Sequence, residues 1–520
     1  METKNLLLVR VSSNLQLLAP IAFFFLFALS STLPALSAER PNILFIMSDD
    51  HALQAVSCYG TGLNQTPNID RIAKEGMRFD RCYVTNSLCG PSRACILTGK
   101  YSHKNGFYAN TRSTFDGDQV TFPKLLRLAG YQTAIFGKWH LVSEPTGFDA
   151  WEVLVGQGQY YRPDFLTARG KRTIPGYVTN VVTDEAIDWL KKKRDPQRPF
   201  ALMVQHKAPH RPWQPLAAKL GDREDEKFPE PATLFDDYAN RGTAAHKADM
   251  RISQMNPPSD LKLWQKDNPA RRQLFNRLSD EDRAAWERLV DPRREKFDAA
   301  NPQGDERTRW FYQLYMKDYL RCVESVDDSV GALLKYLDDN GLAKNTIVVY
   351  TSDQGFYLGE HGWFDKRFMY EESLRTPLVV RWPGVIKPGS TEDHIVSNVD
   401  FAPTFLEAAG TAIPKEMQGR SLAPVLRGTT PADWRKSFYY HFYEDKDADH
   451  HVAKHEGVTN GHAKLIHFYT LDEWELYDLD KDPHELNSVY GKPEYVQLQA
   501  EMRAELDRLR KELQVPANAE

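Results

Sequence analysis

Consecutive apolar residues recur in four short segments of the chain, which is the pattern of strands buried on both faces of a mainly parallel sheet. These segments are residues 41–48, 132–137, 200–204 and 346–352. Segments with the periodicity and end signals of helices lie between them. The predicted helices are residues 66–75, 121–129, 179–193 and 309–340. Strands that alternate with helices predict an α/β fold, with a large mixed, mainly parallel sheet between helices.

The pattern changes in two places along the chain. Residues 221–306 are rich in charge, proline and asparagine and predict an insertion on the surface of the first domain. After about residue 430 the chain changes to short aromatic strands and a final charged helix, which predicts a smaller α+β domain. The predicted elements there are strands 437–443, 463–469 and 475–478 and helix 493–514. We therefore expect a catalytic domain over 39–430 and a C-terminal domain over 431–520.

The first 38 residues have the pattern of a secretory signal. An apolar run over 17–29 is followed by small residues at 35–38. A membrane anchor is the alternative, but the run is shorter than the roughly 20 residues of a spanning helix and Pro20 interrupts it. No cysteine precedes Cys58, so lipid attachment near the cleavage site is not favoured. We expect a secreted or periplasmic protein without stable membrane insertion.

Composition excludes fewer classes of function than the pattern of apolar and polar residues does. The 520 residues exceed what one hydrophobic core usually supports, which agrees with two domains. With 41% hydrophobic and 26% charged residues the composition is that of a globular protein. A net charge of −5 gives no electrostatic reason to expect a nucleic acid partner.

Polar side chains follow three of the predicted buried strands. Asp49 and Asp50 follow the first, Asp353 and Gln354 follow the last, and Lys138 and His140 follow the second. Ligands of open α/β sheets bind at the carboxyl ends of the strands. Three carboxylates and an amide form an oxygen-rich set that suits a hard cation. Each such residue could instead cap a helix or form a turn, but two matching strand ends favour a metal site.

Lys138 and His140 are separated by one residue, so on a strand their side chains would share a face. Two cationic groups beside carboxylates suggest an anionic substrate held between a metal and a base. A salt-bridged strand end is the alternative.

The segment CGPSRACILTG, residues 89–99, has the signals of a helix that begins beside a thiol. Pro91 suits the first turn and Gly99 suits the end. Cys89 would then lie next to the free amides of the helix, which attract anions and lower the pKa of a thiol. A buried structural cysteine is the alternative, but the Gly90-Pro91 turn and the adjacent Arg93 argue against it. The chain has five cysteines and no C-x-x-C pair, so zinc has no support from spacing and one cysteine would be left unpaired.

This segment resembles the signature of the type I sulfatases, the formylglycine-dependent branch of the alkaline phosphatase superfamily. The resemblance continues through PNILFIMSDD, GKWH, Ala208-Pro-His210 and the block from TSDQG to DKRFMYE, and weakens in the insertion and the C-terminal domain. It implies that a formylglycine-generating maturation enzyme oxidises Cys89 during export, which leaves four cysteines. It also implies calcium as the cofactor. The implied calcium ligands are Asp49, Asp50, Asp353, Gln354 and the modified Cys89. Many family members carry asparagine where this chain has Gln354.

The resemblance also implies roles for the remaining polar residues. Arg93 would hold the aldehyde hydrate, in which one hydroxyl attacks sulfur and deprotonation of the other expels sulfate. The sulfate would be surrounded by Lys138, His140, His210 and Lys366. His140 and His210 are the candidates for protonating the leaving oxygen, and the nearby His206 is interpreted as structural.

The block over 353–371 is most similar to the N-acetylglucosamine-6-sulfatase branch of the family. This implies a sulfated glycan as the substrate and removal of a 6-O-sulfate from a terminal N-acetylglucosamine. Asp365 and Arg367 would then lie near sugar hydroxyls and His361 near the sulfate pocket. The alternatives are a sulfatase for iduronate 2-sulfate or an algal polysaccharide, a phosphonate or phosphate ester hydrolase, and a non-catalytic glycan-binding protein. The last would require loss of Cys89 or a metal ligand, and none is lost.

Overall fold

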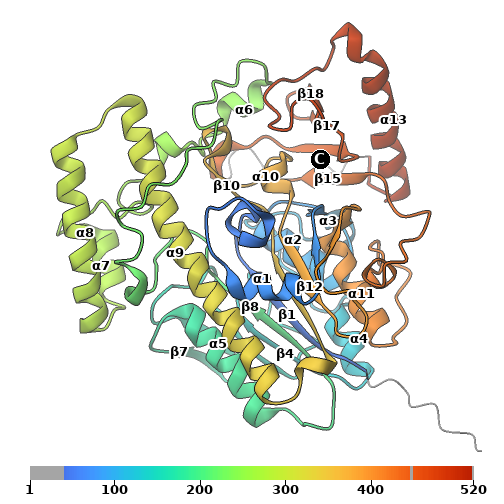
Figure 1. The fold of residues 1–520 in the computed structure, drawn as a ribbon. Coiled ribbons are helices and arrows are strands. Elements are labelled where there is room, and N and C mark those ends of the chain that lie inside the picture. Colours follow the sequence, from blue (N-terminus) through green and yellow to red (C-terminus); the bar gives the residue numbers. More distant parts are fainter. Residues whose placement is uncertain (1–39, 445–448, 518–520) are drawn as a thin grey trace, which may run out of the picture. The chain divides into compact units, whose positions relative to one another are not determined.

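A computed structural model describes residues 40–444 and 449–517, so the predicted signal over 1–38 lies outside the described residues. A ten-stranded sheet forms the centre of the fold (Figure 1). Its strands, in spatial order, are β13 (Ser390–Glu392), β2 (Met77–Phe79), β12 (Leu378–Arg381), β9 (Thr346–Ser352), β1 (Asn42–Ser48), β8 (Phe200–Gln205), β4 (Gln132–Gly137), β5 (Ala150–Leu154), β6 (Asp164–Thr167) and β7 (Gly170–Thr173). The five central strands, β9 to β5, are parallel, and antiparallel pairs flank them. The mixed, mainly parallel sheet is therefore confirmed.

The central strands are buried on both faces. In β1, Leu44 and Ile46 pack into one apolar cluster, whereas Phe45 and Met47 pack into another on the opposite face. This alternation follows from the two-residue period of a strand. It explains why the first strand is continuously apolar instead of alternating with polar residues.

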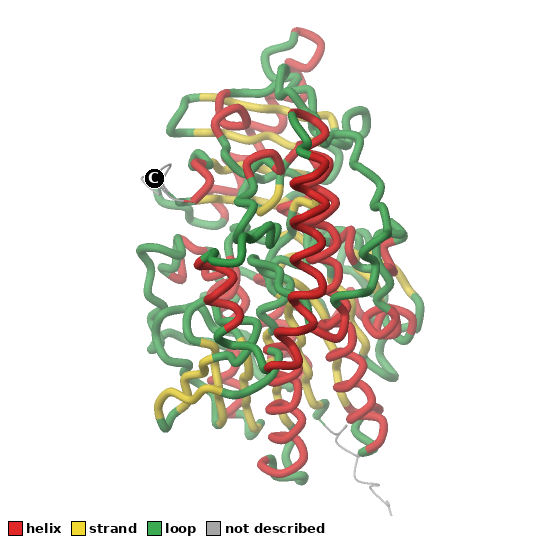
Figure 2. The backbone as a smooth tube through the Cα atoms, turned by 90° about the vertical axis from the view of Figure 1, so that its left-hand side faces the viewer, coloured by secondary structure: helices red, strands yellow, loops and turns green. Residues whose placement is uncertain are grey.

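Helices cover the two faces of the sheet (Figure 2). α9 packs against α1 and α5 in one layer, and α11 packs against α2 and α4 in the other. Their bounds are α1 Pro67–Lys74, α2 Cys89–Thr98, α4 Phe122–Leu128, α5 Val178–Asp188, α9 Gly304–Asp339 and α11 Phe401–Ala408. The helices predicted over 66–75, 121–129, 179–193 and 309–340 are thus present, although α5 ends in a π-helical turn at Trp189–Lys193 and α9 begins five residues early. Three further α-helical segments are short, namely α3 (Ser102–Asn105), α10 (Glu371–Leu374) and α12 (Ala423–Leu426).

The segment 221–306 contains helices of its own, α6 (Thr243–Lys247), α7 (Pro269–Phe275) and α8 (Asp280–Ala300). A buried ion cluster joins it to α9. The carboxylate of Asp318 on α9 accepts hydrogen bonds from both Nη atoms of Arg293, at 2.9 and 3.1 Å, and its Oδ2 lies 3.2 Å from Nζ of Lys262. The insertion therefore has a buried anchor as well as a charged surface.

The C-terminal part forms a separate four-stranded antiparallel sheet, with strands β15 (Phe438–Phe442), β16 (His455–Thr459), β17 (Ala463–Phe468) and β18 (Glu473–Asp478). Helix α13 (Val496–Glu512) packs against this sheet. Three of the strands and the helix match the sequence prediction, whereas β16 is an addition. Small two-stranded pairs complete the described sheets, β10 (Tyr357–Leu358) with β11 (Phe364–Asp365) and β14 (Val396–Ser397) with β3 (Cys82–Tyr83).

The described residues from 40 onward form one compact unit. A domain boundary at residue 430 remains a prediction. Within the described ranges, no helix combines the length and the apolar character needed to cross a bilayer.

Candidate active site

The ends of β1 and β9 bring three carboxylates together. The two strands pair in register, with Ser48 opposite Ser352, so the residues that follow them meet at one edge of the sheet. The backbone N–H of Asp50 donates to Oδ1 of Asp353 at 3.1 Å. Oxygen atoms of Asp49, Asp50 and Asp353 lie within 4.8 Å of one another, and all three side chains are buried. The structure thus brings the two strand ends together at one edge of the sheet.

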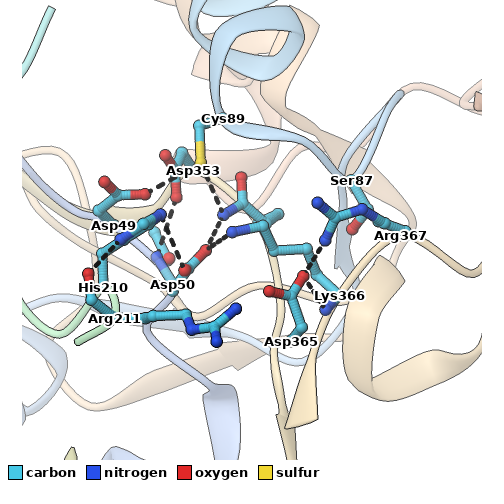
Figure 3. A network of polar contacts seen from close by, with 12 residues as sticks. Asp49, Asp50, Ser87, Cys89, His210, Arg211, Asp353, Asp365, Lys366 and Arg367 are labelled. Carbon is cyan, nitrogen blue, oxygen red and sulfur yellow. Dashed lines mark hydrogen bonds and ion pairs between the residues drawn. The ribbon is translucent and has the colours of Figure 1, made fainter. Parts of the chain in front are cut away.

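Helix α2 places Cys89 against this group (Figure 3). Its sulfur lies 3.2 Å from Oδ1 of Asp49 and 3.7 Å from Nε2 of Gln354. Cys89 is the first residue of the helix, whereas the sequence interpretation placed it just before the helix. Gly99 ends the helix in the left-handed conformation, with φ of 64°, as expected of a glycine at this position.

The Cys89 thiol is 1% exposed. Burial and the negative charge of Asp49 raise its pKa well above the ordinary range. This contradicts the expectation of a thiol activated by the helix terminus, because the desolvation of a buried thiolate and the neighbouring carboxylate oppose ionisation. An unmodified Cys89 is a poor nucleophile in this environment.

Arg93, one turn further along α2, joins three parts of the site. Its Nη2 donates to Oδ2 of Asp353 at 2.8 Å, and its Nη1 donates to Oε1 of Gln205 at 2.6 Å and to the carbonyl of Lys138 at 3.0 Å. The guanidinium is buried and fully engaged, so it fixes the helix relative to strands β4, β8 and β9.

Two lysines balance the carboxylates. Nζ of Lys138 contacts Asp49, and Nζ of Lys366 lies 2.6 Å from Oδ1 of Asp50. Burial favours the neutral form of a carboxyl group, but Lys138 and the other nearby cations hold the pKa of Asp49 well below its usual range. Burial raises the pKa of Asp50 to about 6, and burial together with Asp49 raises that of Asp353 to about 7. Protein cations alone therefore stabilise one ionised carboxylate much better than three.

Two histidines complete the cluster. Nε2 of His210 lies 3.7 Å from Oδ2 of Asp50, and its Nδ1 lies 2.7 Å from the carbonyl oxygen of Arg211. Burial and then Lys138 lower the pKa of His140 to about 2 and hold that of His210 well below its usual range. β4 ends at Gly137, and His140 has a φ of 57°, so the prediction that Lys138 and His140 share a strand face is wrong. His206 contacts Ser329 on α9, at 3.0 Å between Nε2 and Oγ, which agrees with a structural role.

The predicted sugar-binding residues separate into two groups. Asp365 and Arg367 form a buried ion pair next to Lys366, as Figure 3 shows. His361 is instead held among the side chains of the insertion and α10. Its Nδ1 lies 3.0 Å from Nη1 of Arg241, and its Nε2 lies 3.5 Å from a carboxylate oxygen of Glu372. The structure therefore places the ring of His361 against Arg241 and Glu372 and not in the cluster around Asp50.

Several residues of the site were not predicted from the sequence. Gln205 and Glu444 each directly follow a predicted strand, so the rule that selected Asp49 could have found them. Glu444 is buried, with one carboxylate oxygen 3.9 Å from Nε of Arg367. Gln157 accepts a hydrogen bond from Nζ of Lys138 at 2.5 Å, and His450 lies 3.3 Å from Asp365. Neither of the last two carries a sequence signal, because Gln157 lies in a loop and His450 in a three-residue 3₁₀ segment, Asp449–His451.

The donor set fits a hard divalent cation. Besides the three carboxylates, Oε1 of Gln354 is buried and has no hydrogen-bond partner, and its Nε2 is directed to Asp50. A buried carbonyl oxygen without a partner is costly unless an unobserved group satisfies it. Oxygen ligands of this kind are those that calcium and magnesium prefer.

Comparison with known proteins identifies the family. The Sulfatase family model matches residues 41–411, which is more than half of the chain. The chain belongs to the sulfatase family. It is therefore a sulfuric ester hydrolase, with the sulfatase fold and its smaller C-terminal sheet. The model for the C-terminal part of N-sulphoglucosamine sulphohydrolase matches residues 359–512.

The sulfatase has relatives of known name. It is 52% identical to N-acetylglucosamine-6-O-sulfatase of Bacteroides thetaiotaomicron over 488 residues, which cover 91% of this chain and 87% of the relative. It is 31% identical to human N-acetylglucosamine-6-sulfatase, over 77% of this chain and 67% of the human protein. Among solved structures, that of BT4656 in complex with its substrate D-glucosamine-2-N,6-O-disulfate has a TM-score of 0.91 and 51% identity, over 93% of this chain and all of the other.

Proposed function

We propose that this sulfatase hydrolyses the 6-O-sulfate of a terminal N-substituted glucosamine in a sulfated glycan, with N-acetylglucosamine as the first candidate. The observation that carries the proposal is the 52% identity to an N-acetylglucosamine-6-O-sulfatase over nine-tenths of the chain. The related structure that binds a 2-N,6-O-disulfated glucosamine supports the same position of the reacting sulfate and adds an N-sulfated sugar as a second candidate.

The proposed cofactors are calcium and a formylglycine formed from Cys89. Asp49, Asp50, Asp353 and Gln354 supply oxygen atoms that would hold the calcium, which would polarise the sulfate and neutralise charge when bound. The aldehyde of formylglycine, once hydrated, would supply the nucleophilic hydroxyl. The high pKa of the encoded thiol supports the need for modification, because the thiolate is disfavoured there.

The protein's own side chains account for the other requirements of the reaction. Lys138 and Lys366 place two ammonium groups beside Asp49 and Asp50, where they can contact sulfate oxygens. His140 and His210 are the proposed proton donors to the sugar oxygen, on which charge develops as the S–O bond breaks. The ion pair of Asp365 and Arg367 lies beside Lys366 and offers both an acceptor and donors to sugar hydroxyls.

A primary 6-sulfate extends from the sugar ring on a flexible carbon. It can enter a buried group of charges while the ring stays outside, whereas a 2-O- or 3-O-sulfate would have to bring the ring with it. The buried position of Cys89 and Asp353 therefore favours the 6-position. Action outside the cytoplasm, in the medium or the periplasm, also remains part of the proposal, together with maturation by a formylglycine-generating enzyme.

The test is sulfate release from a matched panel of sugars. The enzyme, produced together with the maturation enzyme, is incubated with 6-O-sulfated N-acetylglucosamine, 3-O-sulfated N-acetylglucosamine, D-glucosamine-2-N,6-O-disulfate and 2-O-sulfated uronate disaccharides. We expect the highest kcat/KM on a 6-O-sulfated glucosamine and retention of the N-sulfate. Preferred cleavage of the 3-O-sulfated sugar or of a sulfated uronate would overturn the proposal. Arg367→Ala should raise KM for the sugar but not for an aryl sulfate that lacks hydroxyls.

A further inference from the structure

Lys207 is a buried cation close to the site that has no part in the function proposed above. Its side chain is 2% exposed, and among the described residues no carboxylate forms an ion pair with it. Its ammonium lies 5.0 Å from the centre of the Tyr160 ring and 3.3 Å from the carbonyl oxygen of Arg211. Burial lowers the pKa of Lys207 to about 8, so most of the side chain remains protonated at neutral pH. Burying an ammonium group without a carboxylate partner costs free energy, so a role for Lys207 is expected.

The carbonyl of Arg211 receives two side chains at once. Nζ of Lys207 lies 3.3 Å from its oxygen, and Nδ1 of His210 lies 2.7 Å from the same oxygen. A carbonyl can only accept, so Nδ1 of His210 must carry the hydrogen. The other ring nitrogen, Nε2, then faces Asp50 and the site without a hydrogen in the neutral ring. It can protonate a leaving oxygen only after it has taken up a proton from solvent to form the imidazolium, a form that a bound anionic sulfate favours.

Hydrogen bonds to Tyr160 and Lys207 also hold the backbone at His210. The hydroxyl of Tyr160 donates to the carbonyl of His210 at 2.6 Å, and the backbone N–H of His210 donates to the carbonyl of Lys207 at 3.0 Å. Lys207 and Tyr160 therefore hold the two successive carbonyls of residues 210 and 211, while they contact each other through the cation and the ring.

We infer that Lys207 is a positioning residue for His210, which it serves by fixing the Arg211 carbonyl that sets the orientation and tautomer of the imidazole. The inference rests on the proposed function for the role of His210 as proton donor to the leaving oxygen. It assigns Tyr160 a supporting part in the same arrangement.

Leaving groups of different acidity separate this role from a general structural one. Protonation of the leaving oxygen matters most for a poor leaving group such as a sugar alcohol and little for an acidic phenol. A series of aryl sulfates with graded phenol pKa, together with 6-O-sulfated N-acetylglucosamine, therefore measures how much proton donation is lost. Lys207→Met keeps the length of the side chain and removes the donor and the charge. Because the ammonium has no carboxylate partner, we expect this variant to keep its melting temperature.

We expect Lys207→Met to lower kcat about tenfold or more for the least acidic leaving groups and less than about twofold for the most acidic phenol, with little change in KM. The slope of log kcat against the pKa of the leaving phenol therefore becomes steeper in Lys207→Met. Tyr160→Phe should change this slope in the same direction by a smaller amount. Lys207→Arg restores a donor, and a cavity of about 220 Å³ that Lys207 lines together with Tyr160, Gln214 and Trp264 gives the larger side chain room. This variant should recover most of the activity. His210→Ala is the reference and should give the steepest slope.

Equal loss of activity on every aryl sulfate by Lys207→Met, at an unchanged melting temperature, would overturn the inference, as would a normal slope in both Lys207→Met and Tyr160→Phe. If His210→Ala also has a normal slope, the role of His210 as donor is wrong and the inference falls with it. Absence of sulfate release from the sugar by the unsubstituted enzyme would contradict the proposed substrate only, because the aryl series still measures the effect of Lys207. Should Lys207→Met fail to fold, Tyr160→Phe, which keeps the lysine, decides the result.

Discussion

At the residue scale, charge balance decides the chemistry of the site. Three buried carboxylates converge at the site, and the pKa of Asp353 is raised to about 7 because burial and Asp49 both oppose its ionisation. Lys138 and Lys366 contact Asp49 and Asp50 rather than Asp353. A bound divalent cation would restore the balance, and its removal should cost both activity and stability.

Chelation is the first prediction. Dialysis against a chelator should abolish sulfate release and lower the melting temperature, and calcium should restore both, because a ligand that binds only the folded protein stabilises it. Asp353→Asn should lower kcat/KM by at least about a hundredfold and weaken the rise in melting temperature with calcium. Calorimetric titration with calcium checks the binding directly. Full turnover in metal-free buffer would contradict this prediction.

Modification of Cys89 is the second prediction. Peptide mass spectrometry of enzyme made with the maturation enzyme should find formylglycine at Cys89 and unmodified thiols at the other cysteines, because only Cys89 is followed by Gly-Pro-Ser-Arg. Cys89→Ala should lose sulfatase activity and keep its melting temperature, since a smaller side chain replaces a thiol with one contact at 3.2 Å and one at 3.7 Å. An active enzyme with an unmodified Cys89 is the contrary result. None of the five cysteines forms a disulfide within the described residues.

The sequence predicted most of the charged centre, because its residues follow buried strands or belong to a family motif. Asp49 and Asp353 were found through strand ends, and Arg93 and His210 through resemblance. The position of His361 could not be predicted, because its surroundings depend on Arg241, which lies in an insertion that the motif does not cover. Gln157 was missed because a loop glutamine has no periodic or spacing signal.

At the element scale, burial explains which strands the sequence predicted. β1, β4, β8 and β9 are buried on both faces and read as continuous apolar runs. The edge strand β7 has four exposed residues and no apolar face, so its pattern is that of a loop. β16 was not predicted from the sequence for the opposite reason. It is buried, but its sequence begins with His455, Glu456 and Gly457, and the charge of Glu456 is compensated by Arg510 of a distant helix.

The third prediction concerns the anchor between the insertion and α9. Asp318→Asn should lower the free energy of unfolding by about 3–5 kcal/mol, because it leaves the buried Lys262 without a carboxylate and Arg293 with Glu224 as its one remaining partner. Asp338→Asn is the matched control on the same helix. It removes an exposed ion pair with Arg71 and should cost less than about 1 kcal/mol. Urea unfolding of the three proteins measures both effects.

The loss of stability caused by Asp318→Asn should depend on pH. Burial alone would raise the pKa of Asp318, but Arg293 and Lys262 lower it to about 2. A carboxyl group with a lowered pKa in the folded state adds stability above its unfolded pKa of about 4, and this stability is lost as the pH falls through the folded value. The gap in melting temperature between the unsubstituted protein and Asp318→Asn should therefore narrow between pH 4 and pH 2. A constant gap would mean that Asp318 acts by packing alone.

At the scale of the whole molecule, the C-terminal sheet supports the active site. The hydroxyl of Tyr440 on β15 accepts a hydrogen bond from the backbone N–H of Ser87 at 3.1 Å, two residues before Cys89, and donates to the carbonyl of Arg367 at 2.5 Å. Nζ of Lys464 on β17 lies 3.0 Å from a carboxylate oxygen of Glu371 in α10. The small sheet is thus bound to both segments that carry the site.

The fourth prediction follows from these contacts. Thermal unfolding should be a single transition, with coincident curves from circular dichroism and from tryptophan fluorescence, since the described residues from 40 onward form one compact unit. Tyr440→Phe should lower kcat/KM for the sugar without separating the curves. Two resolved transitions would instead show that residues 431–520 unfold independently, as the sequence alone suggested for a separate domain.

The burial of Cys89 sets a time limit on its proposed oxidation during synthesis. Gln354, which contacts the sulfur in the folded protein, lies 265 residues later in the chain. At ribosomal rates of about 5–20 residues per second, this part of the chain follows Cys89 by roughly 13–50 s. During that interval β9 does not yet exist, so the strand end that encloses the thiol cannot form. A maturation enzyme must act on the growing or unfolded chain, because an enzyme supplied after folding could not reach the buried sulfur of Cys89.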